Sequence, residues 1–198
     1  MEIRSWRNPI VILICATLIL LVSFGVRQTY GIFLAPISKA HGWPLAPLST
    51  AMALQTLIWG MATPLLGGIA DKYGAGRVVS LGLILYAVGL WMMATSASPA
   101  EMTFSIGLLT GIGVSATGFP IILAVVGRSV PEKRRSLFLG IASAGGPSGQ
   151  VLIVPLTQQI ISAEGYVTAL IFLAVAMVFI VPLVASVSGK PQQPDGPN

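Results

Sequence analysis

The stretch Gly67–Arg77, with the sequence GGIADKYGAGR, separates two long apolar runs and indicates where the chain turns. Asp71 and Lys72 lie in its middle, and Gly74 follows shortly before the next apolar run. Glycine permits the positive φ angles of a tight turn, and charged side chains hold such a turn in the headgroup region of a bilayer. The stretch therefore predicts a short hairpin between two membrane-spanning helices.

The composition around this stretch is typical of an integral membrane protein. Of the 198 residues, 55% are hydrophobic and only 9% are charged, whereas soluble domains carry about 25% charged residues. The net charge of +5 alone would also fit a nucleic-acid-binding protein, but the basic residues are scattered through short segments between apolar runs. Because cationic loops are favoured on the cytoplasmic side of a membrane, we expect a lipid bilayer as the surroundings and no nucleic-acid partner.

The apolar residues fall into six segments, each with the roughly 20 residues that a helix needs to cross a hydrocarbon core. The segments cover approximately residues 9–37, 46–70, 78–97, 101–126, 137–162 and 166–187. The sequence thus predicts an all-α membrane protein with a six-helix bundle over residues 1–187. Residues 188–198 are polar and rich in proline, which predicts a polar tail or the truncated start of a central linker.

The basic residues of the loops predict the orientation. If the N-terminus is cytoplasmic, Lys39 is the basic loop residue on the outer side, and all others lie inside. Those inner residues are Arg4, Arg7, Lys72, Arg77, Arg128, Lys133, Arg134, Arg135 and Lys190. The bias comes from short loops, where the positive-inside rule is valid, and it predicts both termini in the cytoplasm.

Arg27 is unusual because it lies inside the first apolar segment, in SFGVRQTYGIF. A charge at the centre of a spanning helix costs about 2.5–3.5 kcal/mol on insertion scales, so it ordinarily faces a protein interior or a water-filled cavity. Tyr30 lies three residues on and shares its helical face. Two interpretations remain open: the guanidinium binds an anionic substrate, or it extends to the outer interface.

Two buried amides are further candidates for substrate binding. Gln55 and Gln150 lie within the second and fifth apolar segments, and an amide is costly to bury without partners. Each could equally join neighbouring helices, a contact worth about 0.6 kcal/mol. Apart from Glu101 at the outer edge of the fourth segment, the six segments contain no Asp or Glu, and the chain shows no metal-ligand cluster, nucleophile–base pair or phosphate loop. We therefore expect no enzyme activity, no metal and no cofactor.

Small residues predict close packing in the fourth and fifth segments. The fourth carries Gly107, Gly111 and Gly113, and the fifth carries GGPSG at 145–149. Small residues four positions apart let helix backbones approach, which lipid does not otherwise promote. A second charged hairpin, GRSVPEKRRS at 127–136, lies between these segments, and its Arg128 could pair with Asp71.

These features together resemble a known family. SFGVRQTYGIFLAPI at 23–37, GGIADKYGAGR at 67–77 and GRSVPEKRRSLFLGIASAGGPSG at 127–149 resemble the N-terminal half of a bacterial major facilitator superfamily transporter. More narrowly, they are similar to its monocarboxylate-transporter-like branch, which often has a basic residue in helix 1, as Arg27 is here. The resemblance implies a multi-pass protein of a cell membrane, for a bacterium the inner membrane.

The resemblance also implies an architecture and a mechanism. It implies a bundle of two inverted three-helix repeats that rocks against a second such bundle, with the substrate between them. The charged hairpin would lock one state of the cycle, and Gly67 would admit a helix of the other bundle. The residues to which it assigns this gating are Gly67, Asp71, Lys72, Gly74, Arg77 and Arg128.

Two departures from the family pattern bear on function. Ala75 and Gly76 replace basic residues common in the hairpin, and the chain has six apolar segments where family members have twelve. The first hypothesis is that the chain is the N-terminal half of a secondary carrier for a small organic anion that resembles a monocarboxylate. In this hypothesis the chain pairs with a second six-helix bundle. The alternative is a truncated or non-transporting membrane fragment or an assembly partner.

Overall fold

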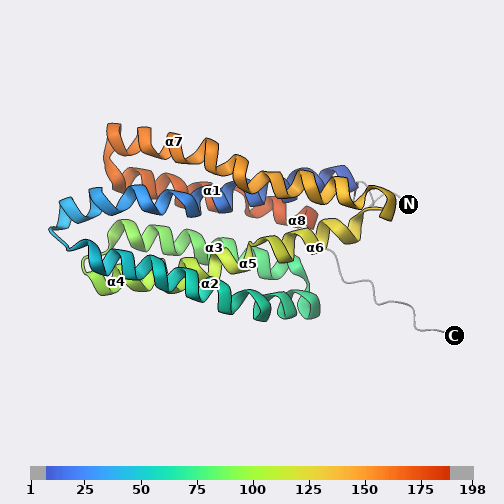
Figure 1. The fold of residues 1–198 in the computed structure, drawn as a ribbon, viewed down its shortest axis with the longest axis horizontal. Helices are drawn as coiled ribbons and strands as arrows, with labels where there is room; N and C mark the ends of the chain where they lie inside the picture. Colours follow the sequence, from blue (N-terminus) through green and yellow to red (C-terminus); the bar gives the residue numbers. More distant parts are fainter. Residues whose placement is uncertain (1–7, 188–198) are drawn as a thin grey trace.

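The computed structural model describes residues 8–187, which form an elongated helical bundle (Figure 1). These residues contain no strand. They include five helical stretches long and apolar enough to cross a membrane: Pro9–His41, Leu45–Tyr73, Ala75–Thr95, Pro99–Ser129 and Glu132–Leu183. The predicted all-helical membrane class is confirmed. Arg4, Arg7, Lys190 and the predicted tail at 188–198 lie outside the described residues.

The first two helices lie antiparallel and are joined by a short turn. Helix α1 (Pro9–His41) begins at Asn8, whose Oδ1 accepts a hydrogen bond of 3.0 Å from the backbone N–H of Ile10. It ends at Gly42, which has a φ of 66°. Helix α2 (Leu45–Tyr73) follows, and both helices are longer than the apolar segments 9–37 and 46–70.

The hairpin between α2 and α3 is tighter than the sequence predicts. Helix α2 continues to Tyr73 and α3 (Ala75–Thr95) begins two residues later, so Gly74 alone lies between them. Gly74 has a φ of 98°, which is accessible to glycine and rarely to other residues. The charged residues Asp71 and Lys72 therefore belong to the last turn of α2. A helix that emerges from the hydrocarbon region can continue in this way, because its charged side chains then lie in water.

The fourth apolar stretch is irregular. It comprises α4 (Pro99–Thr103), a π-helical segment (Phe104–Thr110), α5 (Gly111–Ala116) and α6 (Phe119–Ser129). The break between α5 and α6 directly precedes Pro120, as expected of a residue that cannot donate a backbone hydrogen bond.

The last stretch reverses direction within one continuous run. Helix α7 (Glu132–Phe179) contains Gly165, whose φ of 86° and ψ of 168° are not helical. Figure 1 shows the chain doubling back there, at the end of the bundle that also holds the turn between α1 and α2. A short 3₁₀ turn (Val181–Leu183) and α8 (Val184–Val187) complete the described chain. Gly165 falls in the gap between the predicted segments 137–162 and 166–187.

Glycines bring α1 and α7 into backbone contact. A Cβ added at Gly145 would lie 2.6 Å from the carbonyl oxygen of Thr17, and one added at Gly149 would overlap the carbonyl of Leu21. A Cβ at Gly25 would lie 2.7 Å from the carbonyl oxygen of Gly149. The predicted close approach at GGPSG is confirmed, and α1 is its partner.

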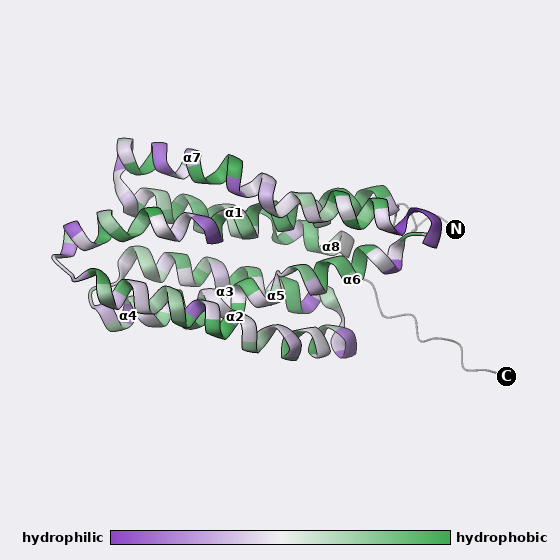
Figure 2. Ribbon diagram, viewed as in Figure 1, coloured by the Kyte–Doolittle hydropathy of each residue, from purple (hydrophilic) through white to green (hydrophobic). Residues whose placement is uncertain are grey.

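Polarity divides the bundle along its length (Figure 2). Hydrophobic residues fill the middle, and hydrophilic residues gather toward the two ends. The end that holds Gly74 and the junction of α6 and α7 carries most of the described basic loop residues: Lys72, Arg77, Arg128, Lys133, Arg134 and Arg135. The opposite end carries Lys39, Glu101 and Glu164. The start of α1 and α8 share the basic end (Figure 1).

Candidate functional site

Several polar and aromatic side chains lie at the middles of their helices. The midpoint of α1 is Gly25, and Arg27 lies half a turn beyond it. Trp59 is the middle residue of α2, and Tyr86 lies next to the middle of α3. These residues therefore occupy one level of the bundle, far from both charged ends.

Arg27 lies over an aromatic ring rather than against a carboxylate. Its Cζ is 4.4 Å from the centroid of the Trp59 ring, within the range of a cation–π contact. Its Nε is buried and has no hydrogen-bond partner. Among residues 8–187 the ion pair observed is that of Arg128 with Asp71, so no acidic side chain neutralises Arg27.

A second aromatic side chain, Phe24, packs against the indole of Trp59. The Phe24 ring meets the Trp59 ring edge to face, with centroids 6.1 Å apart and planes at 73°. Phe24 also contacts Phe119 of α6 at a centroid distance of 4.3 Å. Ser115 donates a hydrogen bond of 3.1 Å to the backbone carbonyl of Trp59. Phe24 of α1 thus contacts the Trp59 ring, Phe119 of α6 supports Phe24, and Ser115 of α5 holds the backbone of Trp59.

A second group of polar side chains lies beside Arg27. Tyr30 is 1% exposed, and its hydroxyl lies close to the side chains of Thr110, Tyr86 and Gln55 without meeting the geometry of a hydrogen bond to any of them. Tyr86 Oη donates to the carbonyl of Ser23 at 3.2 Å. Gln55 Nε2 donates to Thr110 Oγ1 at 3.1 Å, which joins α2 to the π-helical segment. The predicted candidates Arg27, Tyr30 and Gln55 therefore lie in one region.

One face of α1 carries three buried polar atoms without partners: Ser23 Oγ, Arg27 Nε and Tyr30 Oη. The three residues follow the i, i+4, i+7 spacing of a helical face. Leaving such a group unpaired costs about 1–3 kcal/mol, so buried polar atoms in folded proteins are normally paired with protein, water or a ligand. Since a guanidinium has only donors and a hydroxyl can donate, this face is suited to an anion.

Gln150 is not part of this group. It is half-buried on α7, and no hydrogen bond, ion pair or ring contact in the described part of the chain joins it to Arg27, Tyr30 or Gln55. Its neighbour Gly149 contacts the backbone of α1 at Leu21.

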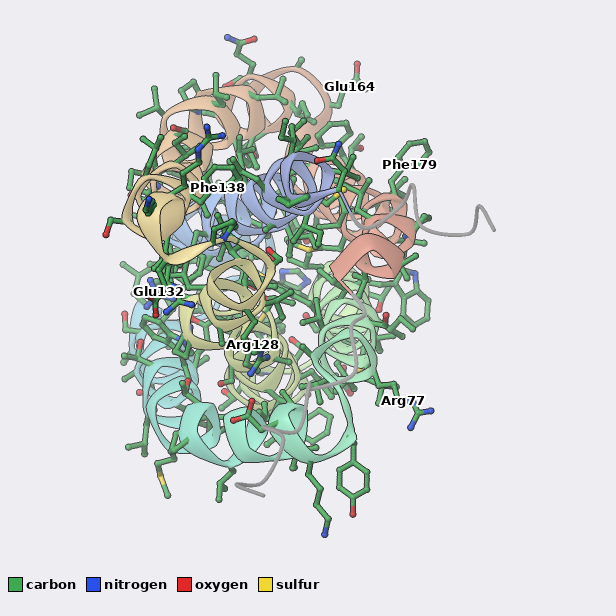
Figure 3. The ribbon with its side chains drawn as sticks, turned by 90° about the vertical axis from the view of Figure 1, so that its right-hand side faces the viewer. Arg77, Arg128, Glu132, Phe138, Glu164 and Phe179 are labelled. Carbon is green, nitrogen blue, oxygen red and sulfur yellow. The ribbon has the colours of Figure 1, made fainter. Side chains whose placement is uncertain are left out.

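The predicted gating residues lie at the basic end, and the structure brings two of them together. Arg128 Nη1 lies 3.1 Å from Asp71 Oδ1, joining the ends of α6 and α2, so the predicted pairing is confirmed. Lys72 Nζ lies 5.2 Å from the ring centroid of the adjacent Tyr73. Arg77 is exposed and extends outward from the bundle (Figure 3).

The two predicted gating glycines differ. Gly74 has the positive φ that makes the turn, whereas Gly67 lies within α2. Gly67 is half-buried, and a Cβ added there would meet no atom within 4 Å. Among the residues that the structure describes, nothing lies against this side of Gly67.

Reasoning from the sequence missed the aromatic part of the site. It did not select Phe24, Trp59, Tyr86 or Phe119, because an aromatic residue in an apolar segment is equally suited to lipid. One signal was present: Trp59 lies four residues after Gln55, so the two share a face of α2.

Comparison with known proteins places the chain among transporters. The profile of the Major Facilitator Superfamily matches residues 15–198. The chain is 28% identical over 173 residues to "Probable anion transporter 3, chloroplastic" of Oryza sativa subsp. japonica, covering 83% of this chain and 32% of the relative. It is 28% identical over 151 residues to "Monocarboxylate transporter 13" of Bos taurus, covering 76% of this chain and 35% of the relative.

A bacterial relative gives a similar result. The chain is 25% identical over 181 residues to the "Oxalate:formate antiporter" of Oxalobacter formigenes, covering 91% of this chain and 43% of the relative. The chain thus spans less than half the length of these relatives. All three are transporters, which confirms the prediction that the chain is not an enzyme.

Proposed function

Because the chain belongs to the major facilitator superfamily, as its motifs predicted, we propose that it forms the N-terminal six-helix bundle of a secondary transporter for small organic anions. Residues 1–187 form this bundle, with spans five and six separated at Gly165. A run of 52 residues supports two crossings, since at 1.5 Å per residue it would extend about 78 Å as one helix.

The orientation and location belong to the same proposal. The basic loop residues at the end that holds Gly74 support a cytoplasmic position for that end, and therefore for both termini. The protein is a multi-pass protein of a cell membrane, the inner membrane of a bacterium.

Arg27 is the observation that carries the proposed substrate class. It is a cation at mid-bundle with no acidic partner among residues 8–187, and it stands beside the unpaired hydroxyl of Tyr30. The planar guanidinium can donate two parallel hydrogen bonds to one carboxylate. The printed names of the relatives, which include monocarboxylate transporters and an oxalate:formate antiporter, support a small carboxylate as the anion.

The remaining proposed roles complete a transport cycle. Gln55 supports the substrate region through Thr110, and Gln150 reaches it in another state of the cycle. A second six-helix bundle covers α2 near Gly67, where the described residues leave open space. The charged turn, with Asp71, Lys72, Gly74, Arg77 and Arg128, stabilises one of the two states by its ion pair.

Uptake by variants of Arg27 tests the proposal. In cells that contain this chain with the second bundle, uptake of labelled oxalate, formate and lactate is measured and normalised to the protein in the membrane. Arg27→Ala should lower kcat/KM about 10- to 150-fold, the loss of a hydrogen bond to a charged group. Arg27→Lys should retain part of the uptake, because the charge remains but the planar fork does not.

Lys133→Ala is the matched control, since it removes an exposed cation at the basic end and should leave uptake unchanged. Wild-type uptake by Arg27→Ala would overturn the role of Arg27. If the chain reaches the membrane but supports no uptake and co-purifies with no second bundle, it is a non-transporting membrane protein instead.

A further inference from the structure

We infer that Trp59 is a positioning residue that holds the guanidinium of Arg27 at mid-bundle without neutralising its charge. The inference rests on the proposed function, in which Arg27 binds the anion. The contact is the 4.4 Å approach of Arg27 Cζ to the Trp59 ring centroid, between the middles of α1 and α2. Tryptophan is the side chain that attracts a cation most strongly through its ring face.

A membrane protein must stabilise a charge that it keeps away from water, and a carboxylate is the usual partner. A carboxylate would occupy the same N–H groups that a carboxylate substrate needs, so substrate binding would first have to break an internal ion pair. An indole instead attracts the cation through its ring face and has no oxygen that would accept hydrogen bonds from the guanidinium. The guanidinium N–H groups therefore stay available to an anion.

The surroundings of Arg27 agree with this arrangement. The described carboxylates lie at the two ends of the bundle, and the one that pairs with an arginine, Asp71, pairs with Arg128. The buried Nε of Arg27 has no hydrogen-bond partner, so the stack does not depend on a fixed hydrogen bond. The guanidinium is therefore held by the ring face and keeps its capacity to donate.

Trp59 can act in this way because its own position is fixed. The rings of Phe24 and Trp59 meet edge to face, Phe119 supports Phe24, and Ser115 donates to the backbone carbonyl of Trp59. Phe24 is 6% exposed and belongs to the core. A ring packed against Phe24, on a backbone held by Ser115, restricts the rotamers of the long arginine side chain, which lowers the entropy lost when an anion binds.

Uptake kinetics in two backgrounds test the inference. Trp59→Leu should raise KM for the labelled carboxylate about 5- to 30-fold, the range of a partly buried cation–π contact, with a smaller change in kcat. Trp59→Phe should retain most of the affinity, because a ring face remains. In the Arg27→Ala background, Trp59→Leu should change the residual uptake by less than about twofold, since the group that it positions is gone. Trp91→Leu is the matched control, because Trp91 is an exposed tryptophan on α3.

Fluorescence separates this inference from the proposed function. In a variant whose only tryptophan is Trp59, Arg27→Ala should change the emission of the indole without any substrate, whereas Lys133→Ala should not. Equal effects of Trp59→Leu in both backgrounds, or unchanged emission in Arg27→Ala, would overturn the positioning role while the proposed function stands. Unchanged uptake in Arg27→Ala together with altered emission would remove the proposed function and leave the contact intact.

Discussion

Helices α1 and α2 meet at Arg27 and Trp59, yet they are embedded in the bundle to very different degrees. In the apolar 18-residue stretch of α1, 56% of the residues are buried inside the bundle, whereas in the corresponding stretch of α2 only 6% are buried. On α1, Gly25 is covered by the backbone of α7, whereas on α2 Gly60, Gly67 and Gly68 face no atom within 4 Å of an added Cβ. Helix α1 is therefore a core element, whereas α2 packs against the other described helices along only a narrow strip of its surface.

The composition of the open face of α2 indicates more than contact with lipid. Exposed apolar residues on this helix, such as Leu57, Met61 and Leu65, fit lipid and protein equally well. Glycine is different, since in membrane helices small residues occur where another backbone approaches closely. The contrast with Gly25 thus supports a partner for α2 and makes the two kinds of glycine experimentally separable.

The largest expected effect comes from filling the contact between α1 and α7. Gly25→Val would drive its side chain into Gly149 and Ile153, and the backbone at Gly149 cannot move aside as a flexible side chain can. We expect destabilisation at or above the upper end of the usual cost of overpacking, about 1–3 kcal/mol. Thermal unfolding of the purified protein in detergent measures it.

Gly31→Val is the matched control, because Gly31 lies on the same helix and has open space at its Cβ position. Its melting temperature should stay close to that of the wild type. Equal losses in both variants would mean that α1 does not depend on the glycine contact, and the contrast between α1 and α2 would lose its basis.

A smaller effect, confined to activity, is expected at Gly67. Gly67→Leu should leave the thermal unfolding of the described bundle within about 0.5 kcal/mol of wild type, as for other substitutions outside packed regions. In the two-bundle assembly, the added side chain should obstruct the helix that approaches α2. Uptake should then fall about 5- to 150-fold, the equivalent of 1–3 kcal/mol of overpacking in one state of the cycle.

Gly60→Leu is the comparison variant for Gly67→Leu. A Cβ added at Gly60 also meets no atom within 4 Å, but Gly60 lies two turns closer to the middle of α2. Reduced uptake in Gly67→Leu with wild-type uptake in Gly60→Leu would place the approach near the basic end of the bundle. Full uptake in both variants would indicate that lipid, not a helix, covers this face.

The same contrast shows what the sequence could predict. Apolar length predicted the membrane helices, glycine chemistry predicted the turn at Gly74 and the close approach at Gly149, and complementary charge predicted the pairing of Asp71 with Arg128. Each of these depends on local composition or on a simple attraction. The fold class and part of the site followed from them.

The rest depends on how helices are rotated about their axes. An apolar residue such as Trp59 fits lipid and protein interior equally, so only its neighbours on α1 show that it faces Arg27. For the same reason Gln150, a buried amide by sequence, could not be placed, and the structure leaves it apart from Gln55. The extent of α2 was underestimated because charged residues can continue a helix beyond the hydrocarbon region.

A small effect on stability is also expected at the ion pair of Asp71 and Arg128. Their side chains are 67% and 48% exposed, so water and salt screen the attraction. Arg128→Gln should change the free energy of unfolding by only about 0–1 kcal/mol, as for other surface ion pairs. If the pair stabilises one state of the transport cycle, uptake should nevertheless respond more strongly than folding does.

Exchanging the charges of Asp71 and Arg128 tests whether the two residues act as an ion pair in the transport cycle. Asp71→Arg and Arg128→Asp should each lower uptake, since each places like charges together across the ends of α2 and α6, and the double variant should recover at least part of the loss. The coupling should weaken as salt rises from 0.05 to 0.5 M, because the Debye length falls to about 4 Å. Independent, additive losses would assign the two residues separate roles in transport, without a functional ion pair between α2 and α6.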